Sequence, residues 1–281
     1  MKKIIASVSL LCALALFLTA CGEPLEISLG GDASGSPSGS QASIVINGDG
    51  TGGGNGDASE ASQAADNRPA EEKYAEATSA YPDVRAWIQI PGTYVDHAVV
   101  QGSDDSFYLE KGLGKSYNWY GSIFAHFDND VSSADALDQN TILFGHNKND
   151  GLMFGSLVNY SDANYAQAHP FVTLLIGDVK TTWEVFAALD CEVNADSFHY
   201  IKTSLSDDDI ANARSRSYLD FGTEVSSSDK ILTLSTCTYK YTYSSGKYRE
   251  DVRYVVMAKL VDDGAAAPSV SANGDRVTPT F

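Results

Sequence analysis

Three polar residues in the C-terminal half of the chain could together catalyse acyl transfer. Cys237 ends the apolar segment 230–237, His146 follows the apolar residues 141–144, and Arg253 directly precedes the apolar run 254–261. A thiolate can attack a carbonyl carbon, an imidazole can carry protons, and a guanidinium can stabilise developing negative charge. Each side chain lies at the edge of a strand-like segment, where a substrate could reach it.

The segment KILTLSTC predicts a strand that presents the thiol on one face. Side chains alternate along a strand, so Leu232 and Leu234 share the buried face and Cys237 lies opposite with Ser235. A lone cysteine is more often a packed small hydrophobe than a nucleophile, so the proposal depends on His146 and Arg253. Ser235 and Thr236 are candidates for substrate binding, although ordinary strand polar residues are an equally good interpretation.

Two other residues compete for these roles. His126 also ends an apolar segment in a polar loop, and Arg249 lies four residues before Arg253. A strand-edge arginine can also form a surface ion pair, here with Glu250 or Asp251. Of the remaining histidines, His97 and His199 are expected to be solvated, and His169, which precedes a proline, is expected in a turn.

Three segments of the chain resemble the signature segments of sortases, the cysteine transpeptidases that attach proteins to Gram-positive cell walls or link pilins. They are TLSTC ending at Cys237, FGHN around His146 and RYVVMAKL from Arg253. The resemblance is to class B in particular and covers about residues 70–262. Further class B-like segments are AWIQIPGT at 86–93, HAVVQGSDDSFYLEKG at 97–112, GSIF at 121–124 and GLMFGSL at 151–157.

The resemblance implies a mechanism and two substrates. Cys237 would attack a carbonyl within a C-terminal sorting signal and form a thioacyl enzyme, His146 would act as general acid and base, and Arg253 would stabilise the oxyanion and orient substrate. An amine, from a peptidoglycan precursor or a pilin lysine, would then resolve the intermediate. No metal or organic cofactor is required. Arg253 follows Cys237 by 16 residues, a longer separation than the family leads us to expect.

Two alternatives remain open from the residues. One is a cysteine peptidase, in which water resolves the thioacyl intermediate. The other is a non-catalytic extracytoplasmic lipoprotein that binds a peptide or another ligand.

The first 21 residues predict a lipoprotein-type signal peptide. Two lysines precede an apolar run, and the sequence LTAC ends in Cys21, which would be lipidated. The alternative is an uncleaved membrane anchor, and both interpretations put the rest of the chain at the extracytoplasmic face of the membrane. Residues 22–69 are rich in Gly, Ser and Asp and predict a flexible tether.

Residues 70–262 predict one mainly β catalytic domain. The predicted strands lie at 97–100, 121–125, 141–145, 171–176, 181–193, 230–237 and 253–261, and the predicted helices at 71–80, 153–160 and 206–218. This pattern favours a mostly antiparallel barrel. The resemblance implies a closed sortase barrel of about eight strands, with N-terminal helices and a helix inserted before the cysteine strand. Residues 263–281 are expected to be a disordered tail.

Charge and cysteine usage exclude other classes of site. The chain has 37 acidic and 19 basic residues, a net charge of −18, which argues against nucleic-acid binding. Cys191 lies within an apolar strand and is expected to be a packed thiol, not a disulfide partner of Cys237. A zinc site is not supported because no Cys-x-x-Cys pair occurs, and the acidic cluster 128–130 is interpreted as a turn.

Overall fold

The computed structural model describes residues 66–193, 198–279 and 281. The elements are α1 (Ala70–Ala80), β1 (Val84–Gln89), β2 (Asp96–Gln101), β3 (Ile123–Ala125), β4 (Asn140–Phe144), the 3₁₀ helix η1 (Gly155–Ser161), α2 (Ala163–Ala168), β5 (Phe171–Ile176), β6 (Val179–Glu192), α3 (Asp207–Arg216), β7 (Leu219–Asp220), β8 (Ile231–Cys237), β9 (Val252–Val261) and β10 (Ser271–Ala272).

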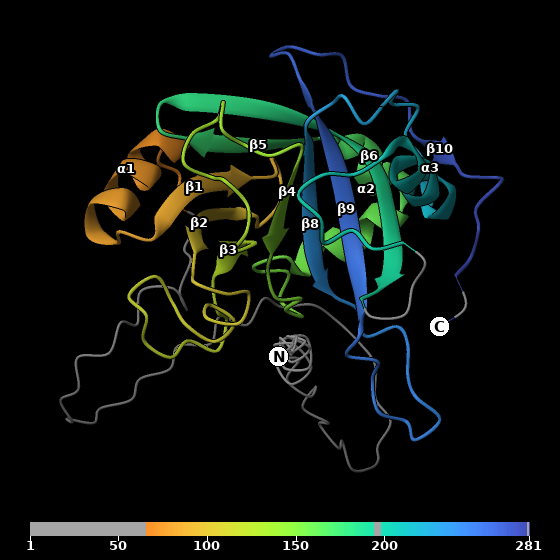
Figure 1. Ribbon diagram of the computed structural model, residues 1–281, viewed down its shortest axis with the longest axis horizontal. Coiled ribbons are helices and arrows are strands. Elements are labelled where there is room, and N and C mark those ends of the chain that lie inside the picture. The colour runs from red at the N-terminus through yellow and green to blue at the C-terminus, as the bar shows by residue number, and fades with distance from the viewer. Residues whose placement is uncertain (1–65, 194–197, 280) are drawn as a thin grey trace, which may run out of the picture. The chain divides into compact units, whose positions relative to one another are not determined.

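Within these residues, eight strands close into a barrel in the order β1-β2-β3-β4-β8-β9-β6-β5 (Figure 1). Most neighbouring strands are antiparallel, but β2 pairs with β3 and β4 pairs with β8 in parallel. The parallel pairing of β4 and β8 matters for the site, because parallel strands end at the same edge of the sheet. The mainly β, closed-barrel architecture expected from the sequence is confirmed.

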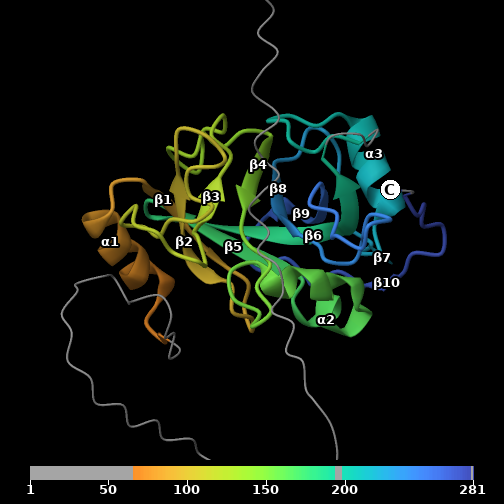
Figure 2. The ribbon, with the colours of Figure 1, turned by 90° about the horizontal axis from the view of Figure 1, so that it is seen from below.

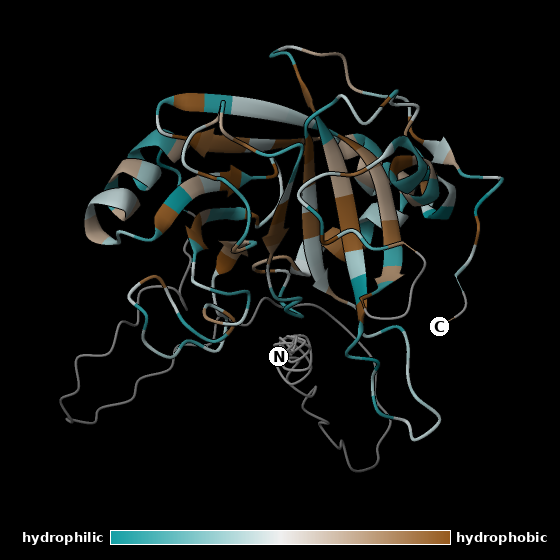
Figure 3. Cartoon of the chain, viewed as in Figure 1, coloured by the Kyte–Doolittle hydropathy of each residue, from teal (hydrophilic) through white to brown (hydrophobic). Residues whose placement is uncertain are grey.

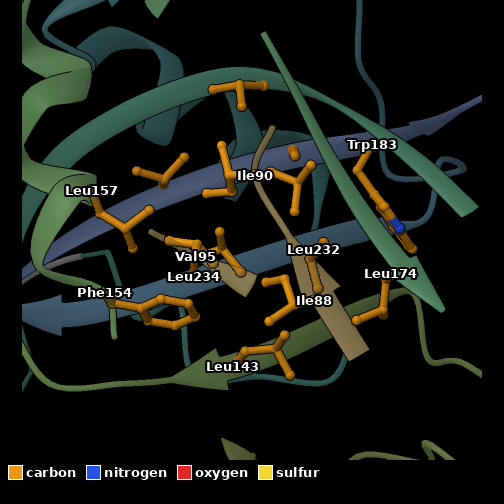
Figure 4. Close-up of a cluster of buried hydrophobic side chains, with 14 of the residues drawn as sticks. Ile88, Ile90, Val95, Leu143, Phe154, Leu157, Leu174, Trp183, Leu232 and Leu234 are labelled. Carbon is orange, nitrogen blue, oxygen red and sulfur yellow. The ribbon is translucent and has the colours of Figure 1, made fainter. Parts of the chain in front are cut away.

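The alternation of β8 divides its side chains between two hydrophobic clusters. Leu232 and Leu234 face the barrel interior with large, fully buried side chains such as Trp183 and Phe154 (Figure 4). Ile231 belongs instead to a second cluster on the outside of the sheet, beneath α3. Hydrophobic residues accordingly concentrate on the strands in Figure 3. Burial on both faces explains why this strand is more apolar than a half-exposed one.

Helix α3 lies between β6 and β8 in the chain, where the inserted helix was expected. Ser206 accepts a hydrogen bond from the Asp209 backbone N–H, and the Asp209 side chain accepts one from the Ser206 backbone N–H in return. This capping box satisfies orphan donors of the first turn. Helices α1 and α3 lie on opposite sides of the barrel (Figures 1 and 2).

Two local features differ from the expectation. The predicted helix 153–160 forms as the 3₁₀ helix η1, and α2 was not predicted at all. Helix α2 has only six residues, and the side chain of Asp162 caps it by accepting a hydrogen bond from the Tyr165 N–H at 2.9 Å. A helix this short leaves too little periodicity to be recognised in a sequence.

The C-terminal segment 263–281, expected to be a disordered tail, makes defined contacts in its described part. Its strand β10 pairs with β7. The Val277 N–H donates to the Ser215 carbonyl at 2.7 Å, and Asn273 Nδ2 donates to the Ser217 carbonyl at 2.9 Å. These bonds involve the backbone, which composition alone does not reveal.

The predicted signal peptide 1–21, with Cys21, and nearly all of the predicted tether 22–69 lie outside the described residues. In the part of the chain that is described, no helix has the length and apolar character needed to cross a bilayer.

Candidate active site

Three neighbouring strands bring Cys237, His146 and Arg253 to one edge of the barrel. Cys237 is the last residue of β8 and is paired directly with Arg253 of β9. On the other side of β8, Phe144 of β4 is paired with Ser235. His146 lies two residues after Phe144, and Cys237 lies two residues after Ser235, so the parallel register puts His146 level with Cys237. Directly opposed residues of antiparallel strands have Cα atoms about 4.5–5.5 Å apart. The three residues therefore occupy adjacent positions where β4 and β8 end (Figure 1).

The alternation of the strands puts all three side chains on the outer face of the sheet. Arg253 is opposed not only to Cys237 but also to Cys191, which belongs to the outer hydrophobic cluster. Phe144 packs against that same cluster, and His146 shares its face because the two are separated by one residue. The side chains of Cys237, His146 and Arg253 thus face the same side, as acyl transfer requires.

Hydrogen bonds fix the segment that carries His146 to the end of β8. The Gly145 N–H donates to the Ser235 carbonyl at 3.2 Å, and the Thr236 hydroxyl donates to the Gly145 carbonyl at 2.8 Å. Asn147 Nδ2 then donates to the carbonyl of Cys237 at 2.9 Å. These bonds on either side of His146 hold its backbone against the cysteine strand.

His146 is buried and neutral in this environment. Its Nε2 lies 2.6 Å from the carbonyl oxygen of Leu109, and the residue is only 8% exposed. Burial is the largest cause that lowers the pKa of His146 to about 4; the positive charges of Lys148 and Arg253 act in the same direction, and the hydrogen bond to the Leu109 carbonyl opposes them. Because a carbonyl can only accept, Nε2 carries the proton and Nδ1 is the nitrogen that can take one up.

Gly121 makes this packing possible. Its backbone has a φ of +61°, and a Cβ there would lie 2.2 Å from the Leu109 carbonyl oxygen and 3.1 Å from Cδ2 of His146. Any side chain at this position would displace the group that orients the imidazole.

Arg253 and its rival Arg249 have different surroundings. Arg249 forms ion pairs with Glu192 and with Asp251, the latter at 2.6 Å. Arg253 instead donates from Nη1 to the backbone carbonyls of Glu250 and Val252, and it takes part in none of the ion pairs formed by the described residues. Arg249 therefore makes the kind of surface ion pair that was considered for Arg253. Among the described residues, no carboxylate pairs with the guanidinium of Arg253.

The long segment between Cys237 and Arg253 extends the ladder of β8 and β9. Thr242 pairs with Tyr248 in the register that already joins Cys237 to Arg253, and the Tyr243 N–H donates to the Lys247 carbonyl at 2.8 Å. The unusual separation of 16 residues therefore forms a protruding hairpin and does not move Arg253 away from the thiol.

Ser235 and Thr236, the predicted substrate-binding residues, have internal partners. The Ser235 and Tyr200 hydroxyls are 2.8 Å apart, and Thr236 donates to Gly145 as described. Both residues are almost completely buried. Their hydrogen bonds shape the site, and a direct contact with substrate stays a prediction.

His126 lies elsewhere on the sheet. Its backbone N–H donates to the carbonyl of Ile142, which is paired with Thr233, four residues or about 13 Å along β8 from Cys237. Its Nδ1 is 2.6 Å from a carboxylate oxygen of Asp105, and both residues are buried. This pair stabilises the neighbouring loop and separates His126 from the proposed chemistry.

The other histidines and Cys191 complete the comparison with the sequence. His169 ends α2 and contacts the Pro91 carbonyl through Nδ1, as a turn residue would. The expectation that His97 is solvated is wrong, because its Nε2 is buried without a hydrogen-bond partner and burial lowers its pKa to about 4. Cys191 is a buried thiol, as expected, and its sulfur donates to the Phe198 carbonyl, 3.2 Å away.

Sequence reasoning missed several groups that shape the site. Asn147 could have been found from its place directly after His146, and Lys148 from its nearby charge. The Leu109 carbonyl and Tyr200 carry no signal, because they reach the site from distant segments. In the part of the chain that the structure describes, no three His, Cys, Asp or Glu side chains form a group able to hold a metal ion.

Comparisons with known proteins show which family the chain is similar to. Residues 88–261 match the family model described as the sortase domain. Sortase B of Listeria monocytogenes serovar 1/2a is 32% identical over 184 residues, which cover 64% of this chain and 70% of that protein.

Two solved structures are similar in both sequence and fold. A Staphylococcus aureus sortase B–substrate complex is 27% identical with a TM-score of 0.58, covering 69% of this chain and 86% of that one. A structure of sortase B complexed with triglycine is 28% identical with a TM-score of 0.58, covering 69% of this chain and 87% of that one.

Proposed function

The chain belongs to the sortase family as a class B cysteine transpeptidase, and we propose that Cys237, His146 and Arg253 carry its acyl transfer. The observation that carries the proposal is the direct pairing of Cys237 with Arg253 on a face that His146 shares. The substrate complex and the triglycine complex of sortase B support a peptide donor and a peptide amine as the acceptor.

In the first half-reaction, Nδ1 of His146 takes the proton of the Cys237 thiol as the sulfur attacks a backbone carbonyl of the donor. Arg253 stabilises the negative charge on the carbonyl oxygen. The intermediate then collapses, the carbon–nitrogen bond breaks, and His146 gives its proton to the leaving amine. An imidazolium with a pKa of about 4 is a strong proton donor, which favours this step.

In the second half-reaction, an amine attacks the thioester and His146 accepts its proton. The carbon–sulfur bond breaks, the proton returns to the thiolate, and a new amide bond has formed. The donor is a protein with a C-terminal sorting signal, and the acceptor is an amine of a peptidoglycan precursor or of a pilin.

The test is acylation of the full chain, in detergent and with a reducing agent present. The protein is incubated with a library of sorting-signal peptides, with and without triglycine, and mass spectrometry detects the thioester and the products. We expect a thioester on Cys237, none in Cys237→Ala, and an undiminished thioester in the matched control Cys191→Ala. If no peptide acylates the protein, the proposal fails, and if triglycine never enters the product, water is the acceptor and the chain is a peptidase.

We further propose that the chain is tethered to the extracytoplasmic face of the membrane through lipidated Cys21. The support is the LTAC sequence after an apolar run. Metabolic labelling with a radioactive fatty acid should label the wild-type chain and not Cys21→Ala. Unlabelled wild-type chain that stays in the membrane fraction would instead favour an uncleaved anchor.

A further inference from the structure

The C-terminal segment 263–281 lies beyond the part of the chain that matches the sortase domain, which ends at residue 261. Within the described part of this segment, β10 pairs with β7. The ring of Phe281 makes an edge-on contact with the ring of Tyr241, with the two centroids 4.7 Å apart. Tyr241 follows Cys237 by four residues. The segment therefore runs from the end of β9 back to the edge of the barrel that carries Cys237 (Figure 1).

Asp190 anchors the base of the hairpin 238–251 from the inside of the protein. It lies near the end of β6 and is fully buried. The Tyr241 hydroxyl donates to its Oδ2 at 2.6 Å, and Lys240 Nζ lies 3.5 Å from the same oxygen. The Tyr218 hydroxyl, which comes from the turn after α3, also donates to Oδ2 and accepts a hydrogen bond from Lys240. A buried carboxylate is stable only with such partners, so Asp190 ties the hairpin to β6 and to the end of α3.

A stack of two tyrosines connects this network with the catalytic strands. The rings of Tyr218 and Tyr254 are stacked, with centroids 5.8 Å apart and planes 18° apart. Tyr254 directly follows Arg253 in β9 and is paired with Thr236, the residue before Cys237. Its side chain belongs to the interior cluster of the barrel. The stack therefore supports the ends of β8 and β9 from the side opposite the catalytic side chains.

Arg276 of the C-terminal segment lies over the ring of Tyr218. Its guanidinium carbon is 3.9 Å from the ring centroid, and its Nε donates to the Arg216 carbonyl at 3.1 Å. A cation at this distance is attracted by the face of an aromatic ring. The hydrogen bonds of Asn273 and Val277 to the chain around Arg216 fix the backbone on either side of Arg276. The position of Tyr218 is thus controlled in part by the C-terminal segment.

We propose that the C-terminal segment is a positioning element of the transpeptidase and that Arg276 is its main positioning residue. Arg276 acts through Tyr218 and keeps Cys237 and Arg253 aligned. These two residues form the last pair of the continuous β8–β9 ladder, and the ends of elements are where local opening is easiest. A displacement of about 1 Å between reacting groups can cost about 100-fold in rate. The inference rests on the proposed function and assigns a part in it to a segment outside the matched domain.

Acylation kinetics of the full chain measure the effect on the reaction. In Arg276→Ala we expect kcat for thioester formation to fall about tenfold, while KM for the donor peptide changes less than about twofold, because alignment and not donor binding is lost. Arg276→Lys keeps a cation over Tyr218 and should recover about threefold of the loss. The matched control Arg85→Ala removes an arginine from β1, which pairs with neither β8 nor β9, and should leave both constants unchanged.

Hydrogen exchange measured by mass spectrometry locates the effect without any substrate. With a reducing agent present, peptides covering 232–242 and 250–256 should exchange about tenfold faster in Arg276→Ala than in the wild type. Peptides from β1 and β2 should exchange as before, and thermal unfolding shows whether the variant is folded at the assay temperature. A lower melting temperature with unchanged kcat and unchanged exchange in these two peptides would mean a purely structural role and would overturn the proposal.

A double mutant tests whether Arg276 acts through Tyr218. In the Tyr218→Leu background, Arg276→Ala should have no further effect on kcat. The same fold loss in both backgrounds would contradict the proposed route. Should Arg276→Ala not fold, Phe281→Ala removes the other ring contact of the segment and should lower kcat about threefold and speed exchange in 232–242. Wild-type values in that variant would overturn the role of the segment.

The same assays separate this inference from the function on which it rests. A thioester formed equally fast in wild type and Arg276→Ala would overturn the role of Arg276 alone. Wild-type protein that forms no thioester with any peptide would overturn the transpeptidase proposal, and the role of Arg276 in it would fall as well.

Discussion

The protonation state of the buried His146 imidazole leads to a quantitative prediction. Its pKa lies at about 4 against an ordinary value of 6.5, with burial as the largest cause. The difference of about 2.5 corresponds to about 3.4 kcal/mol at 1.36 kcal/mol for each pKa unit. At pH 7 only about one molecule in a thousand would then carry the imidazolium, so the resting imidazole is neutral and protonated on Nε2.

This difference makes the folded state sensitive to acid. The unfolded chain binds a proton at His146 near pH 6.5, whereas the folded chain does so only near pH 4. Stability from this residue is therefore fully present above pH 6.5 and is lost as the pH falls to about 4. The pKa of His97 is also lowered, to about 4, so its protonation destabilises the folded state over the same pH range. His146→Gln should reduce the loss of unfolding free energy between pH 7 and 4 by up to about 3.4 kcal/mol.

Two measurements address the prediction. NMR titration of ¹³C-labelled histidines in Cys237→Ala, with the His146 signal assigned from its loss in His146→Gln, gives the midpoint directly. Urea unfolding at pH 7 and at pH 4 gives the change in stability. The positive charge of Lys148 also lowers this pKa, so Lys148→Gln should raise the midpoint. The matched control Lys180→Gln, at an exposed residue of β6, should leave it unchanged.

The reasoning would be refuted by a His146 midpoint at or above 6 in the Cys237→Ala protein. An equal dependence of stability on pH in wild type and His146→Gln would contradict it as well. Either result would mean that water reaches the imidazole and that burial does not control its protonation.

Three further substitutions test separate parts of the site. Arg253→Lys keeps the charge but removes the planar fork, and we expect kcat/KM for thioester formation to fall about 100-fold; an unchanged value would argue against oxyanion stabilisation by this residue. Thr236→Val removes the bond to the Gly145 carbonyl and should cost about 1–2 kcal/mol in urea unfolding, whereas no loss would mean that this bond does not join β4 to β8. His126→Gln should destabilise the fold by about 2–4 kcal/mol, because buried Asp105 loses its histidine partner. Acylation at Cys237 should persist in this variant. Loss of acylation in folded protein would make His126 part of the mechanism.

The strands were predictable because each contains a short apolar run with clear limits. The predicted strands 171–176 and 230–237 agree with β5 and β8 to within one residue. Both are bounded by turn or polar residues and are rich in β-branched and leucine side chains. The same signal placed Cys237 and Arg253 at strand edges, which is why these two residues stand out in the sequence alone.

Groups that depend on distant segments could not be predicted in this way. His97 lies in β2 with polar residues before it in the chain, and its burial comes from tertiary packing. The Leu109 carbonyl reaches His146 from 37 residues away, and a backbone carbonyl has no identity in the sequence. The role of Tyr200 likewise depends on how the segment before α3 folds over β8.

The distance along the chain between Cys237 and Arg253 was a poor guide to their distance in space. Their alignment is set by the ladder of β8 and β9, which runs without a break from Ile231 paired with Lys259 to Cys237 paired with Arg253. The inward-facing Leu232 and Leu234 hold that register, because a shift by one residue would turn them out of the core. Once the ladder is fixed, the intervening segment can lengthen into a hairpin without moving the guanidinium. It follows that hairpin length can vary for purposes such as substrate choice, while the geometry of the thiol and the arginine is preserved by residues buried in the barrel.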